Sequence, residues 1–167
     1  MNRERRSMNV SRTVLTKIVL PGDTNNHNTL FGGLLMKYID EVAAIAAKRH
    51  TQRDIVTASI DGVHFHKPIL SGHIVTLEAY VSSVGHTSVE VFVKIMTEDF
   101  RSNEQTIAAT SFLTFVALDE HGKPAPVPEV YPETEEQKFV FKDRHARREA
   151  RQKKRIETNK LIKALGS

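Results

Sequence analysis

The stretch that decides the fold is Asp23-Thr24-Asn25-Asn26-His27-Asn28-Thr29-Leu30-Phe31-Gly32-Gly33, which continues into the apolar segment Leu34–Lys48. A polar turn and a glycine pair therefore open a long helix that is apolar around most of its circumference. The start of a helix presents free backbone N–H groups and the positive end of the helix dipole. These features suit it to polarise a carbonyl or to hold an anion.

The same helix carries one acidic pair, Asp40-Glu41, in its middle. Burying a carboxylate is costly unless it is paired, hydrogen-bonded or used in chemistry. Physical reasoning alone leaves two interpretations of Asp40 open, a structural acid paired across an interface and a catalytic acid. Glu41 points about 100° away around the helix and is interpreted as structural. One helix therefore supplies both backbone amides that can polarise a carbonyl oxygen and a carboxylate. This combination predicts a reaction at a carbonyl group.

Composition excludes several classes of protein. The 167 residues contain no cysteine, so a disulfide framework, a thiolate nucleophile and a Cys-based zinc site are excluded, and a reduced cytoplasm is favoured. No signal core follows the polar start, and no apolar run approaches the roughly 20 residues of a membrane helix. Residues 138–167 hold eleven Lys/Arg against three Asp/Glu, whereas the remainder is mildly acidic. Nucleic-acid binding by the whole domain is therefore not supported.

The remaining pattern is one early strand and four later ones. A strand is predicted at 12–20, the helix at 31–50, and further strands at 55–65, 75–81, 89–95 and 107–118. The links between the last four strands are short, which predicts an antiparallel meander. The helix should be enclosed by the curved sheet, and an exposed flank and open edge should remain for dimerisation.

Three segments divide the chain. Residues 1–11 form a polar N-terminal segment, residues 12–130 the globular domain, and residues 131–167 a basic helical tail. A proline-rich connector at 124–128 separates the domain from the tail, in which a charged helix is predicted over 134–165. Apolar residues in the tail suggest that parts of it dock on a neighbouring subunit.

Several motifs, in this order and spacing, resemble the hotdog acyl-CoA thioesterases of the bacterial acyl-CoA hydrolase type, whose mammalian counterparts carry two such domains. They are Pro21-x-Asp23-x-Asn25, Phe31-Gly32-Gly33, Lys37-Tyr38-Ile39-Asp40-Glu41-Val42-Ala43, Val56-Thr57-Ala58-Ser59-Ile60-Asp61, Phe65-x-x-Pro68, Thr87-Ser88-Val89-Glu90-Val91 and Phe112-x-Thr114-Phe115-Val116-Ala117-Leu118-Asp119. The resemblance implies an α+β hotdog fold, in which a curved antiparallel sheet of about five strands wraps around one long helix, followed by a C-terminal helical extension. Asn28 stands where relatives usually have glycine, and asparagine tolerates the left-handed backbone next best.

The resemblance also implies a reaction, the hydrolysis of acyl-CoA to a free acid and CoA. By position in the motifs, Asp40 takes the role of the catalytic acid and Asn25 that of the catalytic asparagine, and the two meet across a dimer interface. Asp40 acts either as general base toward water or as nucleophile on the thioester. No metal or redox cofactor is implied, because CoA arrives as part of the substrate. A homodimer, assembled further as a trimer of dimers, is expected.

Secondary site predictions surround this pair. Gly32 and Gly33 let a ligand approach the backbone, and their first-turn amides are expected to hold the oxyanion. Residues predicted to contact CoA are Ser59, Lys67, Gly85, His86, Thr87 and Ser88. Plainer interpretations of these residues and of Asn25 stay open. The glycines could relieve crowding between the helix and the sheet, Asn25 could form an Asx turn, and residues 85–88 could form a simple hairpin turn.

Other functions are weighed against the hydrolase. His64 and His66 lack a third metal ligand at convincing spacing, so a surface pair is favoured. A hydratase acting on acyl thioesters would need a histidine with its carboxylate, and the central helix has none near Asp40. A non-catalytic acyl-CoA sensor and a nucleic-acid-binding assembly acting through the basic tail remain as alternatives. His27, in the loop before the helix, is not assigned a catalytic role.

Overall fold

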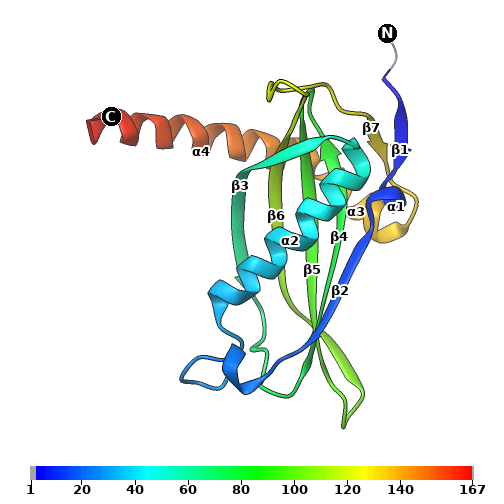
Figure 1. The fold of residues 1–167 in the computed structure, drawn as a ribbon, viewed down its shortest axis with the longest axis vertical. Helices are drawn as coiled ribbons and strands as arrows, with labels where there is room; N and C mark the ends of the chain where they lie inside the picture. Colours follow the sequence, from blue (N-terminus) through cyan, green and yellow to red (C-terminus); the bar gives the residue numbers. More distant parts are fainter. Residues whose placement is uncertain (1–2, 167) are drawn as a thin grey trace.

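The chain forms a curved antiparallel sheet that wraps around one long helix (Figure 1). A computed structural model describes residues 3–166. The helix is α2 (Gly32–Thr51), and the five sheet strands are β2 (Thr13–Ile18), β3 (Asp54–Phe65), β4 (Ile74–Val84), β5 (Ser88–Asp99) and β6 (Glu104–Leu118). This is the α+β hotdog arrangement that the sequence predicts. Among the described residues, no helix is long and apolar enough to cross a membrane.

The strand order corrects one prediction. The sheet runs β2-β4-β5-β6-β3, so the meander holds for β4, β5 and β6 but not for β3. β3 pairs with β6 at the far edge, and residues 66–73 carry the chain back to the opposite side. The turn at residues 71–72 therefore lies within the long connection from β3 to β4, which crosses the sheet. It does not join two neighbouring strands as a hairpin. As a result β3 is an edge strand, and its second edge faces solvent.

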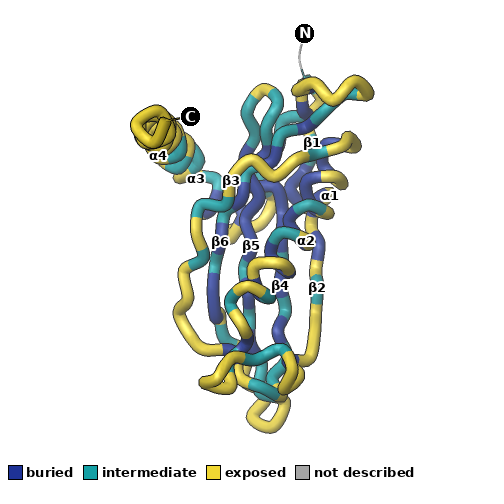
Figure 2. The backbone as a smooth tube through the Cα atoms, turned by 60° about the vertical axis from the view of Figure 1, so that its left-hand side comes forward, coloured by how far each residue is buried: buried dark blue, intermediate teal, exposed yellow. Residues whose placement is uncertain are grey.

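The core lies between α2 and the inner face of β4, β5 and β6. Alternate residues of β5, namely Val89, Val91, Val93 and Ile95, are fully buried there, as the alternation of the sequence predicts. Small side chains on α2, among them Ala43 and Ala46, let the helix lie close to the sheet. Figure 2 shows this buried layer between exposed loops.

The helix is less enclosed than predicted. The sheet covers only one side of α2, because a single curved sheet cannot close around a helix. Met36 and Ile45, which lie about 180° apart at the two borders of the uncovered side, are 43% and 46% exposed. This open flank of α2 runs beside β3, and both belong to the surface that the sequence assigns to dimerisation.

Both ends of the chain add elements that the sequence pattern did not indicate. β1 (Arg5–Ser7) pairs in parallel with β7 (Glu129–Tyr131), and α1 (Met8–Ser11) follows it. Met8 is fully buried, so these residues pack on the domain. The division of the chain at residues 11 and 130 stays a prediction, and residues 1, 2 and 167 lie outside the described part.

The predicted tail helix is two helices, α3 (Glu135–Lys142) and α4 (Arg144–Ala164), separated at Asp143. α3 packs on the outer face of the sheet, against the edge-to-face ring pair Tyr80–Phe92, whose centroids are 5.6 Å apart. The outer face is therefore also covered, which explains why the middle of β4 is buried on both sides.

Candidate active site

Asp40 lies on the open flank of α2, where it meets the edge strand. Its Oδ1 accepts a hydrogen bond of 3.0 Å from Oγ1 of Thr57 on β3. Asp40 is half-buried, and Thr57 is exposed. Within residues 3–166, no other donor reaches the Asp40 carboxylate. One of its oxygens is therefore oriented by the protein, while the other remains available to a ligand.

The loop before α2 holds Asn25 in a tight local network. The Asn25 Oδ1 accepts hydrogen bonds from the amides of His27 (2.9 Å) and Thr29 (3.3 Å), and its Nδ2 donates to Thr29 Oγ1 at 2.9 Å. This is the Asx turn that was the plainer interpretation of Asn25. Asn28 adopts a φ of 61°, which confirms the left-handed position predicted for it. The loop is thus rigidly organised around an exposed asparagine.

The first turn of α2 offers unpaired amides. Leu34 and Leu35 donate to the Phe31 carbonyl, at 3.0 Å each, and Phe31 itself donates to Asp23. In the part of the chain that the structure describes, the amides of Gly32 and Gly33 have no acceptor. They are therefore free to bind an oxyanion at the positive end of the helix.

The two glycines differ in their surroundings. A Cβ on Gly33 would come within 2.7 Å of the Phe31 ring, whereas a Cβ on Gly32 would meet only the Phe65 ring, at 4.0 Å. Gly33 therefore relieves crowding, in line with the plainer interpretation. Gly32 instead leaves an open approach to the backbone, which suits a bound ligand.

The residues predicted to contact CoA lie in separate places. The turn at 85–88 is closed by a 2.8 Å bond from the Gly85 amide to the Ser88 carbonyl. It is tied to the connector after β6, since the Val127 amide donates to the His86 carbonyl. Ser59 is exposed on β3 with its hydroxyl 3.3 Å from Asp61, and Lys67 is exposed on the crossing loop. Of these residues only Ser59 lies close to the Asp40–Thr57 pair in sequence, two positions along β3, and contact with CoA stays a prediction for all of them.

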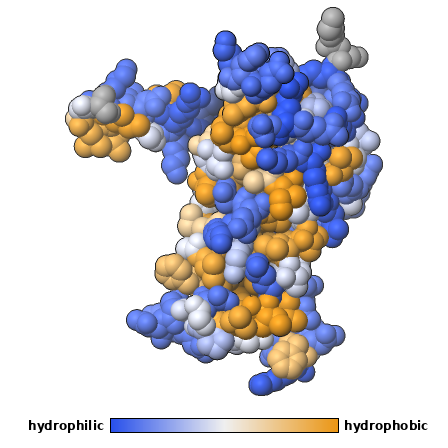
Figure 3. All heavy atoms as spheres, viewed as in Figure 1, coloured by the Kyte–Doolittle hydropathy of each residue, from blue (hydrophilic) through white to orange (hydrophobic). Residues whose placement is uncertain are grey.

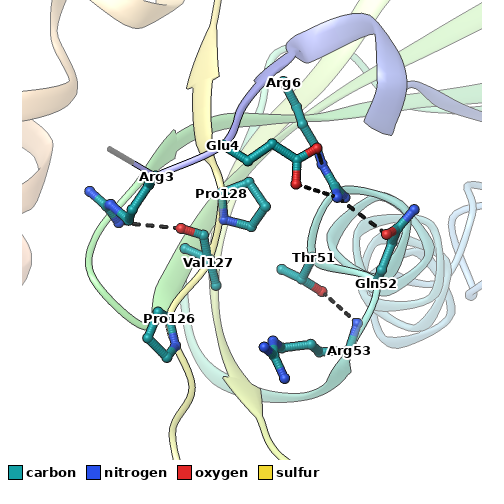
Figure 4. Close-up of a pocket in the computed structure, with 9 residues that line it drawn as sticks. All are labelled: Arg3, Glu4, Arg6, Thr51, Gln52, Arg53, Pro126, Val127 and Pro128. Atoms are coloured by element: carbon teal, nitrogen blue, oxygen red, sulfur yellow. Dashed lines mark hydrogen bonds and ion pairs between the residues drawn. The ribbon is translucent and has the colours of Figure 1, made fainter. Parts of the chain in front are cut away.

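A cavity of about 440 Å³ lies near the C-terminal end of α2 and is lined by Arg3, Arg6 and Arg53 (Figure 4). Two of these guanidinium groups have partners within the chain. Arg6 bonds Glu4 and donates to the His50 carbonyl at 2.6 Å, and Arg3 donates to the Gly85 carbonyl at 2.7 Å. These arginines therefore tie the N-terminal residues to the end of α2 and to the 85–88 turn. His50, also near this cavity, is buried, which lowers its pKa.

Among residues 3–166 there is no group of three or more His, Asp or Glu side chains placed to hold a metal ion. His64 and His66 are exposed on β3 and in the crossing loop that follows it.

Asp40 and Asn25 do not touch within one chain. The direction of β3 nevertheless relates the two positions: it begins beside the C-terminal end of α2 and ends, at Phe65, beside Gly32. β3 and α2 thus run in opposite directions along the open flank. A second copy paired antiparallel through β3 would place its Gly32 end beside the Thr57 end of the first.

Thr57 is the site residue that the sequence analysis did not single out. It stands in a strand-like run, where an exposed threonine is ordinary. The residue predicted nearby, Ser59, lies two positions further along β3. The signal that identifies Thr57 is its hydrogen bond to Asp40, which only the packing of β3 against α2 reveals.

Comparisons with known proteins agree with this geometry. The thioesterase superfamily model matches residues 27–102. A Bacillus subtilis protein described as an uncharacterized acyl-CoA thioester hydrolase is 51% identical over 164 residues, which cover 98% of this chain and 95% of that protein. The chain belongs to the thioesterase superfamily, and its hotdog fold is confirmed.

Solved structures give the same result. The acyl-CoA hydrolase of Staphylococcus aureus, in complex with butyryl coenzyme A, coenzyme A and coenzyme A disulfide, has a TM-score of 0.94 and 45% identity, and the match covers 98% of this chain and 99% of that one. Variants of that enzyme with alanine in place of an aspartate, a threonine or an asparagine are equally similar, with TM-scores of 0.92 to 0.96. A structure described as an apo-hexameric acyl-CoA thioesterase has a TM-score of 0.88 and 44% identity, covering 90% of this chain and 97% of that one.

Proposed function

We propose that this protein is an acyl-CoA thioester hydrolase, which converts acyl-CoA and water into a free carboxylic acid and CoA. The observation that carries the proposal is the Asp40–Thr57 pair on the open flank of α2, in a chain whose helix begins with the free amides of Gly32 and Gly33. The names of the B. subtilis and S. aureus relatives support the same substrate class. Hydrolysis is favoured over the acyl-CoA sensor because those relatives are named as hydrolases.

The spacing of the site residues supports their assignment. The asparagine, aspartate and threonine that were replaced in the S. aureus enzyme lie 15 and 17 residues apart in sequence order. Asn25, Asp40 and Thr57 have the same two separations, and the two chains match over almost their full lengths. This agreement supports Asp40 and Asn25 as catalytic residues and adds Thr57 as a positioning residue.

The proposed site is shared between two subunits. Antiparallel pairing of two β3 edges brings Asn25 and Gly32 of the partner subunit toward Asp40 and Thr57 of the first. The open edge of β3 and the exposed apolar side chains of that strand, Val56 and Phe65, support this dimer, because exposed edges and apolar patches mark association surfaces. The hexameric relative supports further assembly as a trimer of dimers.

The reaction then follows from the geometry. The thioester carbonyl lies against the Gly32 and Gly33 amides, which stabilise the negative charge that develops on its oxygen. Asp40, oriented by Thr57, accepts a proton from the attacking water or attacks the carbonyl itself, and Asn25 orients the attacking oxygen. In either route a carbon–oxygen bond forms at the carbonyl carbon, the carbon–sulfur bond breaks, and the CoA thiolate takes up a proton. Where Asp40 attacks directly, water then cleaves the resulting mixed anhydride, which releases the carboxylic acid and restores Asp40. The residues proposed to contact CoA are Ser59, Lys67 and 85–88. Because the sequence contains no cysteine, we also propose that the protein acts in the cytoplasm, in fatty acid metabolism.

Thiol release from a panel of acyl-CoAs tests this proposal. Native protein is expected to hydrolyse at least one chain length, and Asp40→Ala and Asn25→Ala should each lower kcat by about a hundredfold or more. Glu41→Ala, one residue along the same helix, is the matched control and should retain activity. Binding of acyl-CoA without turnover by the native protein would favour the sensor instead.

Mixing the two inactive variants tests whether the site is shared. After subunit exchange, half of the dimers combine one Asp40→Ala chain with one Asn25→Ala chain, and each has one intact site. Activity should therefore return to about a quarter of the native value if the pair comes from different subunits. If both residues acted within one chain, the mixture would stay inactive.

A further inference from the structure

β3 is an irregular strand, and one of its irregularities lies directly beside the proposed site. Its register against β6 shifts between Thr57 and Ser59 and again between Ile60 and Val63. Such β-bulges insert an unpaired residue and change the face on which the following side chains lie. The first bulge comes immediately after Thr57, whose hydroxyl orients Asp40. The position of Thr57 therefore depends on how the bulged part of β3 is held.

The first bulge shifts the alternation of side chains along β3 by one residue. Thr57 pairs with Phe115, which belongs to the buried core, and its hydroxyl reaches Asp40 on α2. Ser59 would lie on the same face as Thr57 in a regular strand. It pairs instead with Thr114, the neighbour of Phe115 on β6, and so lies on the outer face of the sheet. A slip of β3 by one residue would exchange these faces and turn Thr57 away from Asp40.

A series of polar contacts holds the bulged part of β3 on the outer face. The Ser59 hydroxyl donates to Oδ1 of Asp61 at 3.3 Å, and Oδ2 of Asp61 accepts a bond of 3.4 Å from Arg151 on α4. Arg151 also pairs with the buried carboxylate of Glu90 on β5. The side chains of Arg151 and Asp61 are only 20% and 26% exposed, so salt screens their attraction less than that of a surface pair. Asp61 is therefore tied through α4 to the middle of the sheet.

Charged groups, rather than apolar packing, attach α4 to the sheet. Near the start of the helix, the Arg147 guanidinium stacks 4.3 Å from the ring centroid of Phe112 on β6 and bonds Glu90 at 2.9 Å. Arg151 follows one helical turn later and reaches β3. None of the described residues of α4 is buried. In Figure 3 the helix leaves the body through a mainly hydrophilic stretch, and apolar side chains gather near its end.

We propose that Asp61 and Arg151 are positioning residues for the hydrolysis, because they hold the bulged part of β3 so that the Thr57 hydroxyl bonds Asp40. Within one chain, β6 is the only strand of the sheet that pairs with β3 among the described residues. Pairing with a second copy would engage the backbone at the open edge of β3, whereas the Asp61 side chain meets α4 on the outer face. The C-terminal helix thus contributes to catalysis from the far side of the sheet. This inference rests on the proposed function.

Replacement of Asp61 provides the test, because it leaves the pair of Arg151 and Glu90 in place. Asp61→Ala should lower kcat for thiol release about fivefold and leave KM within about twofold, since the orientation of the catalytic carboxylate is lost rather than substrate binding. Asp61→Asn keeps a side-chain oxygen that can accept a bond from Arg151 and should restore most of the rate. An asparagine variant as slow as the alanine variant would overturn the inference.

The matched control is Asp54→Ala, the same change at the start of the same strand. Asp54 is exposed and pairs with Lys48 at 3.6 Å on the surface, so its removal should leave kcat within about twofold of the native value. Equal losses for the two aspartates would overturn the specific role of Asp61.

A second substitution shows whether Asp61 acts through Thr57. In Thr57→Ala the bond to Asp40 is already absent, so adding Asp61→Ala should lower kcat by less than about twofold further. A full fivefold loss in that background would overturn the inference. So would a raised KM with unchanged kcat, because Asp61 would then serve in binding CoA.

Hydrogen exchange separates this inference from the proposed function, because it needs no activity. The amides of residues 58–63 should exchange faster in Asp61→Ala than in Asp54→Ala. Equal exchange in the two variants of a protein that hydrolyses acyl-CoA would overturn the inference and leave the proposed function intact. A native protein that hydrolyses no acyl-CoA would overturn the proposed function, and with it the role of Asp61 in catalysis.

Discussion

Glu90 on β5 and Asp40 on α2 are both acidic residues on long elements of one domain, but their surroundings differ. Glu90 is 1% exposed and accepts hydrogen bonds from Ser82, Ser83, Arg147 and Arg151. Asp40 is half-buried and, among the described residues, accepts one bond, from Thr57. The comparison shows how a structural carboxylate differs from the one proposed as catalytic: the first is fully satisfied within its own chain, and the second keeps acceptor capacity for a ligand.

The electrostatics of Glu90 follow from this environment. Burial alone would raise its pKa, but hydrogen bonds and positive charge from Arg147, together with Ser82 and Arg151, hold the pKa below its ordinary value of 4.5. The charge of Glu90 thus serves to fix α4 across the sheet.

The largest expected effect is on stability, from Glu90→Ala. Removing this carboxylate leaves Arg147 and Arg151, whose side chains are about one-fifth exposed, without their buried partner. Breaking a buried ion pair in this way costs about 3–5 kcal/mol, and we expect a loss near the lower end because the arginines partly reach solvent. Urea denaturation followed by circular dichroism measures it.

The control is Glu41→Ala on the exposed side of α2. Glu41 is paired with Lys37 at 3.8 Å and its side chain is 50% exposed, so the free energy of unfolding should change by less than about 0.5 kcal/mol. Equal losses for the two glutamates would show that Glu90 is not the structural anchor that its contacts indicate.

A smaller effect is expected for Thr57, and it should appear in activity rather than in stability. Thr57→Ala removes the donor that orients Asp40, and hydrogen bonds to a charged group contribute about 1.5–3 kcal/mol, so kcat should fall about tenfold or more. Thr57→Ser keeps the hydroxyl and should restore most of the rate. Steady-state thiol release measures both variants, and a serine variant as slow as the alanine one would argue against the orienting role.

The sequence predicted those parts of the fold that depend on local pattern. Alternation along β5 identified its buried face, and periodicity placed α2 within one residue of its observed ends. The left-handed backbone at Asn28 was also foreseeable, because few residues other than glycine adopt it. The order of the strands was not foreseeable, because the residues of β3 show the same local pattern whether the strand pairs with β4 or with β6.

Other features depend on contacts that no local pattern carries. Met8 is buried within a polar segment, and the helix break at Asp143 occurs in a charged run without proline or glycine. Thr57 shows its role only through Asp40, seventeen residues away. The catalytic pair of Asp40 and Asn25 was suggested by resemblance, and the single chain leaves the two apart. In the proposed dimer the site is divided between two subunits, so the fold of one chain does not complete it.

The smallest expected effect is a pH dependence that belongs to Glu90. Because its folded pKa lies below the ordinary value of 4.5, the unfolded chain takes up the proton first as the pH falls. The stability contributed by the Glu90 charge is therefore full above that value and is lost as the pH falls through the folded pKa. The difference in unfolding free energy between native protein and Glu90→Gln should be constant above about pH 5.5 and shrink toward pH 3. Urea titrations at fixed pH measure this difference. A difference that persisted unchanged at pH 3 would mean that the packing of the Glu90 side chain, rather than its charge, holds α4 on the sheet.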